Sequence, residues 1–360
     1  MNSGNYDSKL KYSSGILHDI SPKHEIAARQ DRRLSVRFNN DIFDGITNQK
    51  DKILLKSLLL GTTFILIMCA SAMVWANYYR PLLVLDMRNS PELPKHFRTT
   101  SNVLPQSVNP TGLAELHAAG SGQFSALAFK LARERMQTDK LLVIDLRQES
   151  HGMLNGNAVS WYGPRDAANA GKSPEQIETR QSQLLITLGE DEIALVNQIV
   201  KKSDEGEIEK VKPIEFLVHQ TSTEQEFLSG MGVRYQRIYV QDFHAPAADQ
   251  VDRFISIVNE LPKDEWIFFH CRGGVGRTTV FMAMYDMMRN AKKVSFADIM
   301  ARQTALGGKD LTRLPNKKNF KYKWAVNRLK FLQQFYAYSR TNTDNFQTLW
   351  TEWKQITKST

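Results

Sequence analysis

The sequence predicts an α/β fold in which a central sheet is flanked by helices. After Tyr79, short apolar runs bounded by polar residues alternate with longer segments whose apolar residues recur at three- and four-residue spacing. The chain has 360 residues, of which 42% are hydrophobic and 24% charged; this is typical of a folded protein and excludes a wholly disordered or many-span membrane chain. Its two cysteines exclude a disulfide scaffold and a four-cysteine zinc site.

Two segments precede this pattern. Residues 1–52 are polar with scattered charge, so we expect a disordered arm. Residues 53–79 contain the uncharged run SLLLGTTFILIMCASAMVWA, which is long enough to cross a bilayer as a helix, because about 20 residues at 1.5 Å rise cover the hydrocarbon core. We therefore expect a transmembrane-like helix and membrane anchor. The alternative is a secretory signal peptide cleaved after Ala72 or Ala76, although the preceding arm is long for one.

The strands and helices of the folded region follow from local pattern. The short buried runs Leu141–Leu146, Arg237–Val240 and Trp266–His270 predict strands, since each is apolar and bounded by polar residues. Residues 247–261 and 276–290 predict helices because their apolar residues recur at three- and four-residue spacing.

The segment HCRGGVGRTT predicts a phosphate-binding loop with a nucleophile. Its glycines let backbone N–H groups turn inward at the start of a helix, where the helix dipole attracts an anion. Arg277 can hold two phosphate oxygens through its planar guanidinium, and the same positive field favours the thiolate of Cys271, the form that attacks phosphorus. Thr278 can donate its hydroxyl to the sulfur. A nucleotide-binding GxxxxGK[ST] loop is disfavoured, because no lysine precedes Thr278. The loop residues between Cys271 and Arg277 are Arg272, Gly273, Gly274, Val275 and Gly276.

A general acid is expected upstream of this loop. Asp242 lies after a predicted strand and before a predicted helix, in a segment stiffened by Pro246. It can protonate the leaving oxygen and then, as carboxylate, activate the water that hydrolyses a phosphocysteine. The alternative, a helix-capping role, suits Asp249 and Asp252 better.

Cys-(five residues)-Arg, with His270 before it and a glycine-rich helix start behind it, resembles the cysteine-dependent phosphatase superfamily. The long run DLRQESHGMLNGNAVSWYG points to a narrower family within this superfamily. In this run the chain resembles the bacterial protein-tyrosine-phosphatase-like phytases, which dephosphorylate inositol polyphosphates. The resemblance covers most of residues 85–355. Its other matching stretches are LPKHFRTTSN, RDAANAGKS, TEQEFLSGMGVRYQRI, the Asp242 and Cys271 loops, and FKYKWAVNRLKFLQQFY.

The resemblance implies a protein-tyrosine-phosphatase-like core at 85–360, with a smaller inserted subdomain at roughly 100–235, and no metal or cofactor. Two features depart from the family pattern: Phe243 and Ala245 stand where relatives often have His and a bulky aromatic, and Arg272 stands where some have an acidic residue. His244 is a candidate replacement for the missing histidine. The substrate-binding positions implied are Arg98, Asp166, Lys317, Lys321 and Arg328. Read physically, Asp145, Arg147, Glu149 and His151 follow a predicted strand, so we expect them to form a polar network that supports the loop; the alternative is direct contact with substrate. His270 is a further supporting residue.

The positive charge of the chain agrees with a polyanionic substrate. The net charge is +9, and residues 305–360 alone hold 11 Lys and Arg against 3 Asp and Glu. A cluster of this kind attracts polyanions. Because a phosphate loop is present and the middle of the chain is nearly neutral, nucleic acid is the poorer expectation.

The sequence therefore predicts a phosphoric monoester hydrolase that acts on inositol hexakisphosphate and related small polyphosphates through a phosphocysteine. One alternative is a phosphoinositide or protein-tyrosine phosphatase, delivered into a host cell as a bacterial effector. Another is a non-catalytic, membrane-tethered phosphate-binding module. The ten basic residues before the apolar run predict a cytosolic N-terminus, with the catalytic domain on the periplasmic side. The alternatives are secretion or translocation into a host cell. The sequence does not indicate a protein partner.

Overall fold

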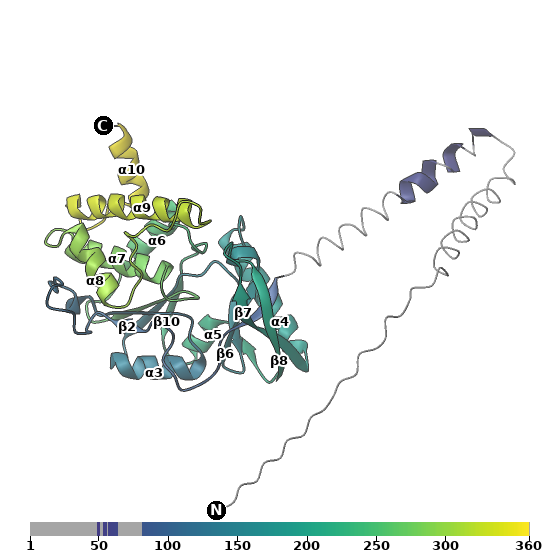
Figure 1. Cartoon of the computed structure of the whole chain (residues 1–360), viewed down its shortest axis with the longest axis horizontal. Helices are drawn as coiled ribbons and strands as arrows, with labels where there is room; N and C mark the ends of the chain where they lie inside the picture. Colours follow the sequence, from purple (N-terminus) through teal and green to yellow (C-terminus); the bar gives the residue numbers. More distant parts are fainter. Residues whose placement is uncertain (1–48, 51–52, 56, 64–80, 360) are drawn as a thin grey trace, which may run out of the picture. The chain divides into compact units, whose positions relative to one another are not determined.

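The computed structural model describes residues 49–50, 53–55, 57–63 and 81–359 (Figure 1). The chain divides into two units, Met1–Tyr78 and Tyr79–Thr360. In the first unit the described residues are helical, and no helix among the described residues is long and apolar enough to cross a membrane. The expected transmembrane helix is thus not found there. Residues 56 and 64–79 of the segment expected at 53–79, and residues 1–48 and 51–52 of the arm expected at 1–52, lie outside the described residues.

The second unit is built on a five-stranded sheet. Its strand order is β10 (Arg234–Arg237), β4 (Leu141–Asp145), β11 (Trp266–His270), β3 (Ala118–Ser121) and β2 (Arg98–Thr99), of which only β2 runs antiparallel to its neighbour. The strands expected at 141–146 and 266–270 are confirmed. The strand expected at Arg237–Val240 is wrong by three residues: β10 ends at Arg237, and the N–H of Tyr239 donates instead to the Gln250 side chain, 2.8 Å away.

Helices cover both faces of this sheet (Figure 1). On one face, α6 (Ala248–Asn259), α7 (Arg277–Asn290), α8 (Phe296–Ala305) and α9 (Tyr322–Thr341) enclose the main core; on the other, α3 (Ala126–Met136) packs its Phe129 against Phe268 of β11. The two helices expected at 247–261 and 276–290 are confirmed as α6 and α7. Further helical segments of this unit are the 3-10 turns η1 (Ala114–Leu116) and η2 (Pro164–Asp166), α5 (Glu224–Ser229) and α10 (Trp350–Ser359).

A second, six-stranded sheet lies beside the first. Its order is β8 (Ile208–Leu217), β7 (Ile193–Lys202), β1 (Leu82–Met87), β6 (Asn157–Tyr162), β5 (His151–Leu154) and β9 (Thr221–Ser222), with α4 (Pro174–Glu190) packed on it through Leu185 and Leu188. β1 of this sheet lies before the insert expected at roughly 100–235. Within that range, β3 and β4 are strands of the first sheet, and α3 packs on that sheet.

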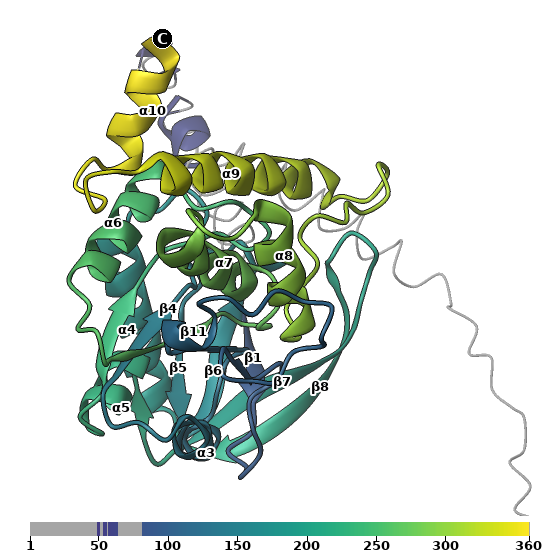
Figure 2. The same ribbon diagram turned by 90° about the vertical axis from the view of Figure 1, so that its left-hand side faces the viewer.

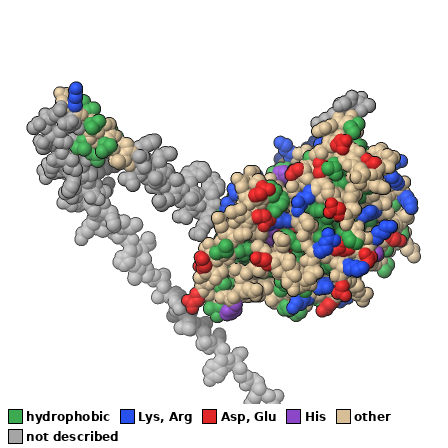
Figure 3. Space-filling model, turned by 180° about the vertical axis from the view of Figure 1, so that it is seen from behind, with side chains coloured by type: hydrophobic (Ala, Val, Ile, Leu, Met, Phe, Trp, Pro, Cys, Tyr) green, Lys and Arg blue, Asp and Glu red, His purple; other side chains and the backbone are tan. Residues whose placement is uncertain are grey.

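The topology brings distant segments to one edge. Cys271 follows β11 and Leu146 follows β4, so both leave the parallel sheet at the carboxyl ends of its strands, where ligands bind in open α/β sheets. The loop before α9 lies beside the tip of the β7–β8 hairpin (Figure 2), and a Cβ added to Gly206 would be 2.9 Å from the Phe320 ring. Seen from behind, the unit shows Lys and Arg interspersed with Asp and Glu, so charges of both signs share that face (Figure 3).

Candidate active site

The loop after β11 surrounds the Cys271 sulfur with hydrogen-bond donors. Cys271 is 3% exposed, and its Sγ accepts hydrogen bonds from the Gly274 N–H at 3.3 Å and from the Thr278 hydroxyl at 3.1 Å. Gly274 has a φ of +76°, and a Cβ there would be 2.3 Å from the Gly122 nitrogen, so the turn requires glycine for both its conformation and its close approach. α7 begins at Arg277, which places the positive end of a helix dipole at the loop.

Arg277, the last loop residue, is held in a fixed orientation. Its NH1 and NH2 donate to the two carboxylate oxygens of Glu149, each at 2.7 Å, and NH1 also donates to the Val240 carbonyl at 3.0 Å. Burial disfavours the charge of Arg277, but Glu149 and Asp242 outweigh it and raise its pKa well above its ordinary value. Burial likewise opposes the charge of Glu149, yet Arg277 and Arg147 hold the pKa of Glu149 far below its usual range. The pair is therefore ionised throughout the neutral range.

Asp242 lies beside Arg277, with its Oδ1 3.5 Å from Nε. The loop that carries it is anchored on α9: Arg328 donates to the Phe243 carbonyl at 3.1 Å, and the Phe243 ring stacks on Trp324 at 6.0 Å. Phe243 has a φ of +67°, which is unusual for a bulky side chain and is maintained by these contacts. The His244 ring packs on Trp324 at 4.9 Å, and its Nδ1 is 2.8 Å from the Asp242 carbonyl.

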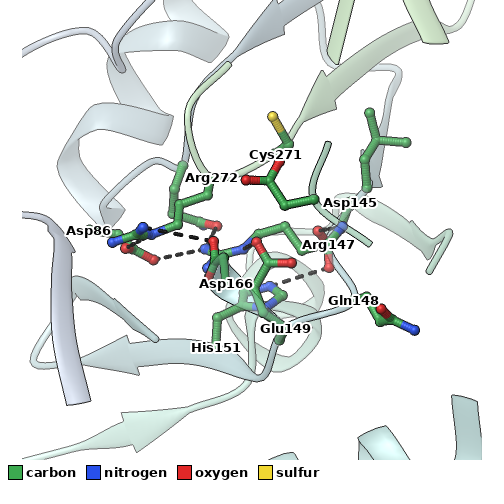
Figure 4. A network of polar contacts seen from close by, with 12 residues as sticks. Asp86, Asp145, Arg147, Gln148, Glu149, His151, Asp166, Cys271 and Arg272 are labelled. Atoms are coloured by element: carbon green, nitrogen blue, oxygen red, sulfur yellow. Dashed lines mark hydrogen bonds and ion pairs between the residues drawn. The ribbon is translucent and has the colours of Figure 1, made fainter. Parts of the chain in front are cut away.

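A buried ionic network lies behind the loop (Figure 4). Arg272 Nε donates to Asp86 at 2.7 Å, and the Arg272 guanidinium stacks over the Tyr162 ring at 4.8 Å. Arg147 donates to the other oxygen of Asp86 at 2.8 Å and, through Nε, to Glu149 at 3.0 Å. The loop is thus ion-paired to the first strand of the second sheet.

The predicted supporting histidines meet two buried carboxylates. His270 Nε2 is 2.7 Å from Glu224 Oε1, and His151 Nε2 is 3.2 Å from Asp145 Oδ2. Burial disfavours a charged Asp145, but His151 and Arg237 hold its pKa far below the usual range. These contacts join β4, β5, β11 and the start of α5, so they fix the strand ends from which the loop departs.

Two arginines expected to bind substrate lie beneath loops instead. Arg98 is 1% exposed and donates to the Gly274 carbonyl at 2.8 Å and the Thr279 hydroxyl at 3.1 Å; burial lowers its pKa to about 10. Arg328 is also buried, and its described hydrogen bond goes to Phe243. Both side chains donate hydrogen bonds to the backbone of a loop. The sequence alone could not distinguish this role from contact with a ligand.

The other predicted substrate-binding positions differ in exposure. Lys321 is partly exposed and its Nζ lies 4.8 Å above the Phe243 ring, whereas Lys317 is exposed and has no ion pair among the described residues. Asp166 is 4% exposed, and its Oδ1 lacks a hydrogen-bond partner in the described structure, while Oδ2 is 3.7 Å from Arg272. Burial and the charge of Glu149, only partly opposed by Arg272, raise the pKa of Asp166 to about 7.

Sequence reasoning missed two cations near the site. Lys202 comes from the β7–β8 hairpin; its Nζ donates to the Tyr162 hydroxyl at 2.9 Å, and desolvation together with the charge of Arg272 lowers its pKa to about 8. Lys309 lies close enough to Arg328, Lys321 and Asp242 for their charges to act on it, and its pKa is lowered by burial and by the first two. No local motif marks either lysine, because the tertiary fold alone places them.

Among the residues that the structure describes, no group of three or more His, Cys, Asp or Glu side chains is arranged to hold a metal ion.

Known proteins share both sequence and fold with this chain. Residues 144–289 match the protein-family model PTPlike_phytase, described as "Inositol hexakisphosphate". Effector protein hopD2 of Pseudomonas syringae pv. tomato is 32% identical over 274 residues, which cover 72% of this chain and 58% of hopD2.

Two solved structures are similar along most of the second unit. One is a PTP-like myo-inositol phosphatase from Mitsuokella multacida in complex with myo-inositol-(1,3,4,5)-tetrakisphosphate, with a TM-score of 0.73 and 30% identity over 78% of this chain and 48% of that one. The other is a PTP-like phytase from Bdellovibrio bacteriovorus, with a TM-score of 0.59 and 34% identity over 76% of this chain and 94% of that one. The chain thus spans about half of the Mitsuokella protein and nearly all of the Bdellovibrio one.

Proposed function

Because the chain belongs to the protein-tyrosine-phosphatase-like phytase family, we propose that it is a cysteine-dependent phosphatase that hydrolyses phosphomonoesters of inositol polyphosphates. The observation that carries this proposal is the buried Cys271 sulfur, which accepts hydrogen bonds from a loop N–H and from Thr278 at the N-terminus of α7. Arg277, preset by Glu149, supplies the guanidinium for the phosphoryl oxygens.

In the first step, the Cys271 thiolate attacks phosphorus, and the bond between phosphorus and the ester oxygen breaks. Asp242 gives its proton to the leaving oxygen, so the dephosphorylated alcohol departs neutral. Loop N–H groups and Arg277 hold the three phosphoryl oxygens as their charge redistributes. The product of this step is a phosphocysteine and an ionised Asp242.

In the second step, Asp242 takes a proton from water as the water oxygen attacks phosphorus. The bond between phosphorus and sulfur breaks, inorganic phosphate forms, and the thiolate returns. Thr278 donates to the sulfur at 3.1 Å, so it stabilises the charge that develops there.

The substrate class follows from the cations around the loop. Lys202, Lys309 and Lys321 all lie where their charge reaches Asp242 or the loop that carries it. Several separate cations suit a ring that bears several phosphates, whereas a single phosphotyrosine is held by the loop alone. The Mitsuokella relative in complex with an inositol tetrakisphosphate supports this choice.

The test is phosphate release by the purified full chain from inositol hexakisphosphate, a soluble phosphoinositide and a phosphotyrosyl peptide. We expect inositol hexakisphosphate to give the highest kcat/KM, Cys271→Ser to abolish release, and a chelator to leave it unchanged. Release by the Cys271→Ser variant would overturn the proposal. Binding of inositol hexakisphosphate without release by the wild type would favour a non-catalytic phosphate-binding protein.

One comparison favours a second setting for the same chemistry. The relative hopD2 is named an effector protein, so we propose that this chain is also delivered into a host cell, where inositol phosphates or phosphoinositides are its substrates. A translocation reporter fused to the full chain tests this: signal inside host cells supports delivery, and retention in the bacterium contradicts it.

A further inference from the structure

Asp86 occupies an irregular position in β1. The pairing of β1 with β6 matches Leu85 to Val159 and Met87 to Ala158, so Asp86 is an extra residue at a β-bulge. Bulges turn a side chain out of the regular alternation of a strand and are common beside active sites. Here the bulge directs the Asp86 carboxylate, which is 1% exposed, toward the Cys271 loop (Figure 4).

Each oxygen of Asp86 accepts from a different arginine. Oδ1 accepts from Arg272 Nε at 2.7 Å, and Oδ2 accepts from Arg147 NH1 at 2.8 Å. Burial disfavours the charged carboxylate, but the charges and hydrogen bonds of the two arginines outweigh burial and lower the pKa of Asp86 to about 2. Asp86 is therefore ionised at neutral pH, between the fully buried Arg147 and the largely buried Arg272.

These two contacts reach both ends of the loop. Arg272 directly follows Cys271 in the chain. Arg147 donates to Glu149 at 3.0 Å, and Glu149 accepts from both terminal nitrogens of Arg277 at 2.7 Å. Positive and negative side chains thus alternate along a buried line from one end of the loop to the other, in the order Arg272, Asp86, Arg147, Glu149, Arg277.

We propose that Asp86 is a positioning residue that presets the phosphate loop from the second sheet. This inference rests on the proposed function of the loop. Asp86 does not touch the reacting atoms; it acts through Arg272 and, by way of Arg147 and Glu149, through Arg277. Without Asp86 the line keeps three guanidinium groups and one carboxylate, and the two freed arginines repel each other in a poorly solvated site.

The alternative is that Asp86 only ties the two sheets together. The two roles differ in what a substitution changes. A structural tie affects thermal stability, whereas a positioning residue also changes the affinity of the folded loop for an anion. Inorganic phosphate reports that affinity without requiring turnover, because bound phosphate protects Cys271 from alkylation by iodoacetate.

The experiment compares full-length wild type with Asp86→Asn. For each protein we measure the phosphate concentration that halves the alkylation rate of Cys271, and kcat and KM on inositol hexakisphosphate. In Asp86→Asn we expect the half-protecting phosphate concentration to rise at least about tenfold and kcat to fall by a similar factor. The double variant Asp86→Asn with Arg272→Gln is expected to lose less phosphate affinity than the two single variants lose in sum, because both substitutions break the same ion pair.

Asp286→Asn is the matched control. Asp286 is fully buried and pairs with Arg302, yet its hydrogen-bond partners lie outside the loop. We expect it to lower the melting temperature at least as much as Asp86→Asn while leaving phosphate protection within about twofold of wild type. Unchanged protection in Asp86→Asn, or fully additive losses in the double variant, would overturn the proposal. If no substrate is turned over but protection still depends on Asp86, the proposed function fails while the positioning role stands.

Discussion

Replacing Glu149 by Gln tests how much of the site depends on one carboxylate. Glu149 accepts from Arg277 NH1 and NH2 at 2.7 Å each and from Arg147 Nε at 3.0 Å. Glutamine has nearly the same shape, but it keeps one acceptor oxygen and turns an NH2 group toward a guanidinium. The substitution therefore removes charge and orientation without leaving a cavity.

Two effects of different kind are expected. Removing one partner of a buried ion pair costs about 3–5 kcal/mol of unfolding free energy, because the remaining charge is uncompensated. Loss of one correctly placed donor for the phosphoryl group lowers kcat by about 10²–10³. Since Arg277 is still present in the variant, the fall in kcat measures its orientation rather than its charge.

Denaturant unfolding gives the first quantity, and initial rates at saturating inositol hexakisphosphate, corrected for the folded fraction, give the second. Glu178→Gln is the control: its carboxylate pairs with Arg237 at 2.9 Å but is 44% exposed, so we expect a change below about 1 kcal/mol and full activity. If Glu149→Gln matches this control in both measurements, the argument that Glu149 holds Arg277 is wrong.

Three further predictions concern other parts of the site. The pKa of Asp166, raised by burial and by Glu149 to about 7, means that the folded state holds a proton that the unfolded state loses near pH 4. Stability should therefore fall as pH rises toward 7, by at most about 1.4 kcal/mol per pH unit, and Asp166→Asn should flatten this slope in melting curves; parallel curves would refute it. Gly274→Ala should abolish phosphate release, because its Cβ would lie 2.3 Å from the Gly122 nitrogen. Gly307→Ala, where φ is +99° but the added Cβ meets open space, should only lower the free energy of unfolding by about 1–3 kcal/mol. Lys202→Ala and Lys309→Ala should each raise KM for inositol hexakisphosphate several-fold more than KM for a monophosphate; equal effects on both substrates would contradict their role in polyphosphate binding.

The sequence predicted those parts of the site that are local in the chain. A buried strand, three glycines and a helix define the Cys271 loop, and the structure has β11 and α7 where the pattern places them. The strand near Arg237 was misplaced, because its end is set by Gln250 of α6, which captures the Tyr239 N–H. That contact depends on how a helix packs on the sheet.

The burial of individual side chains and the pairing of strands could not be predicted in the same way. Family resemblance marks Arg98 as a site position, but only the fold shows that it lies under the loop at 1% exposure. Asp86 is an ordinary residue of an apolar strand in the sequence, and its role depends on a bulge that appears only when β1 pairs with β6. Residues that act through tertiary contacts leave no local pattern.

The most direct test of the account is to trap the covalent intermediate. Asp242→Asn keeps the thiolate and the loop but removes both the acid of the first step and the base of the second, so the trapping substrate is p-nitrophenyl phosphate, whose leaving group departs without a proton. The full-length variant, mixed with this substrate and quenched in acid within one turnover, should carry the mass of one phosphoryl group on the peptide that contains Cys271. A phosphorylated residue elsewhere, or no phosphopeptide while phosphate is still released, would contradict the proposed mechanism.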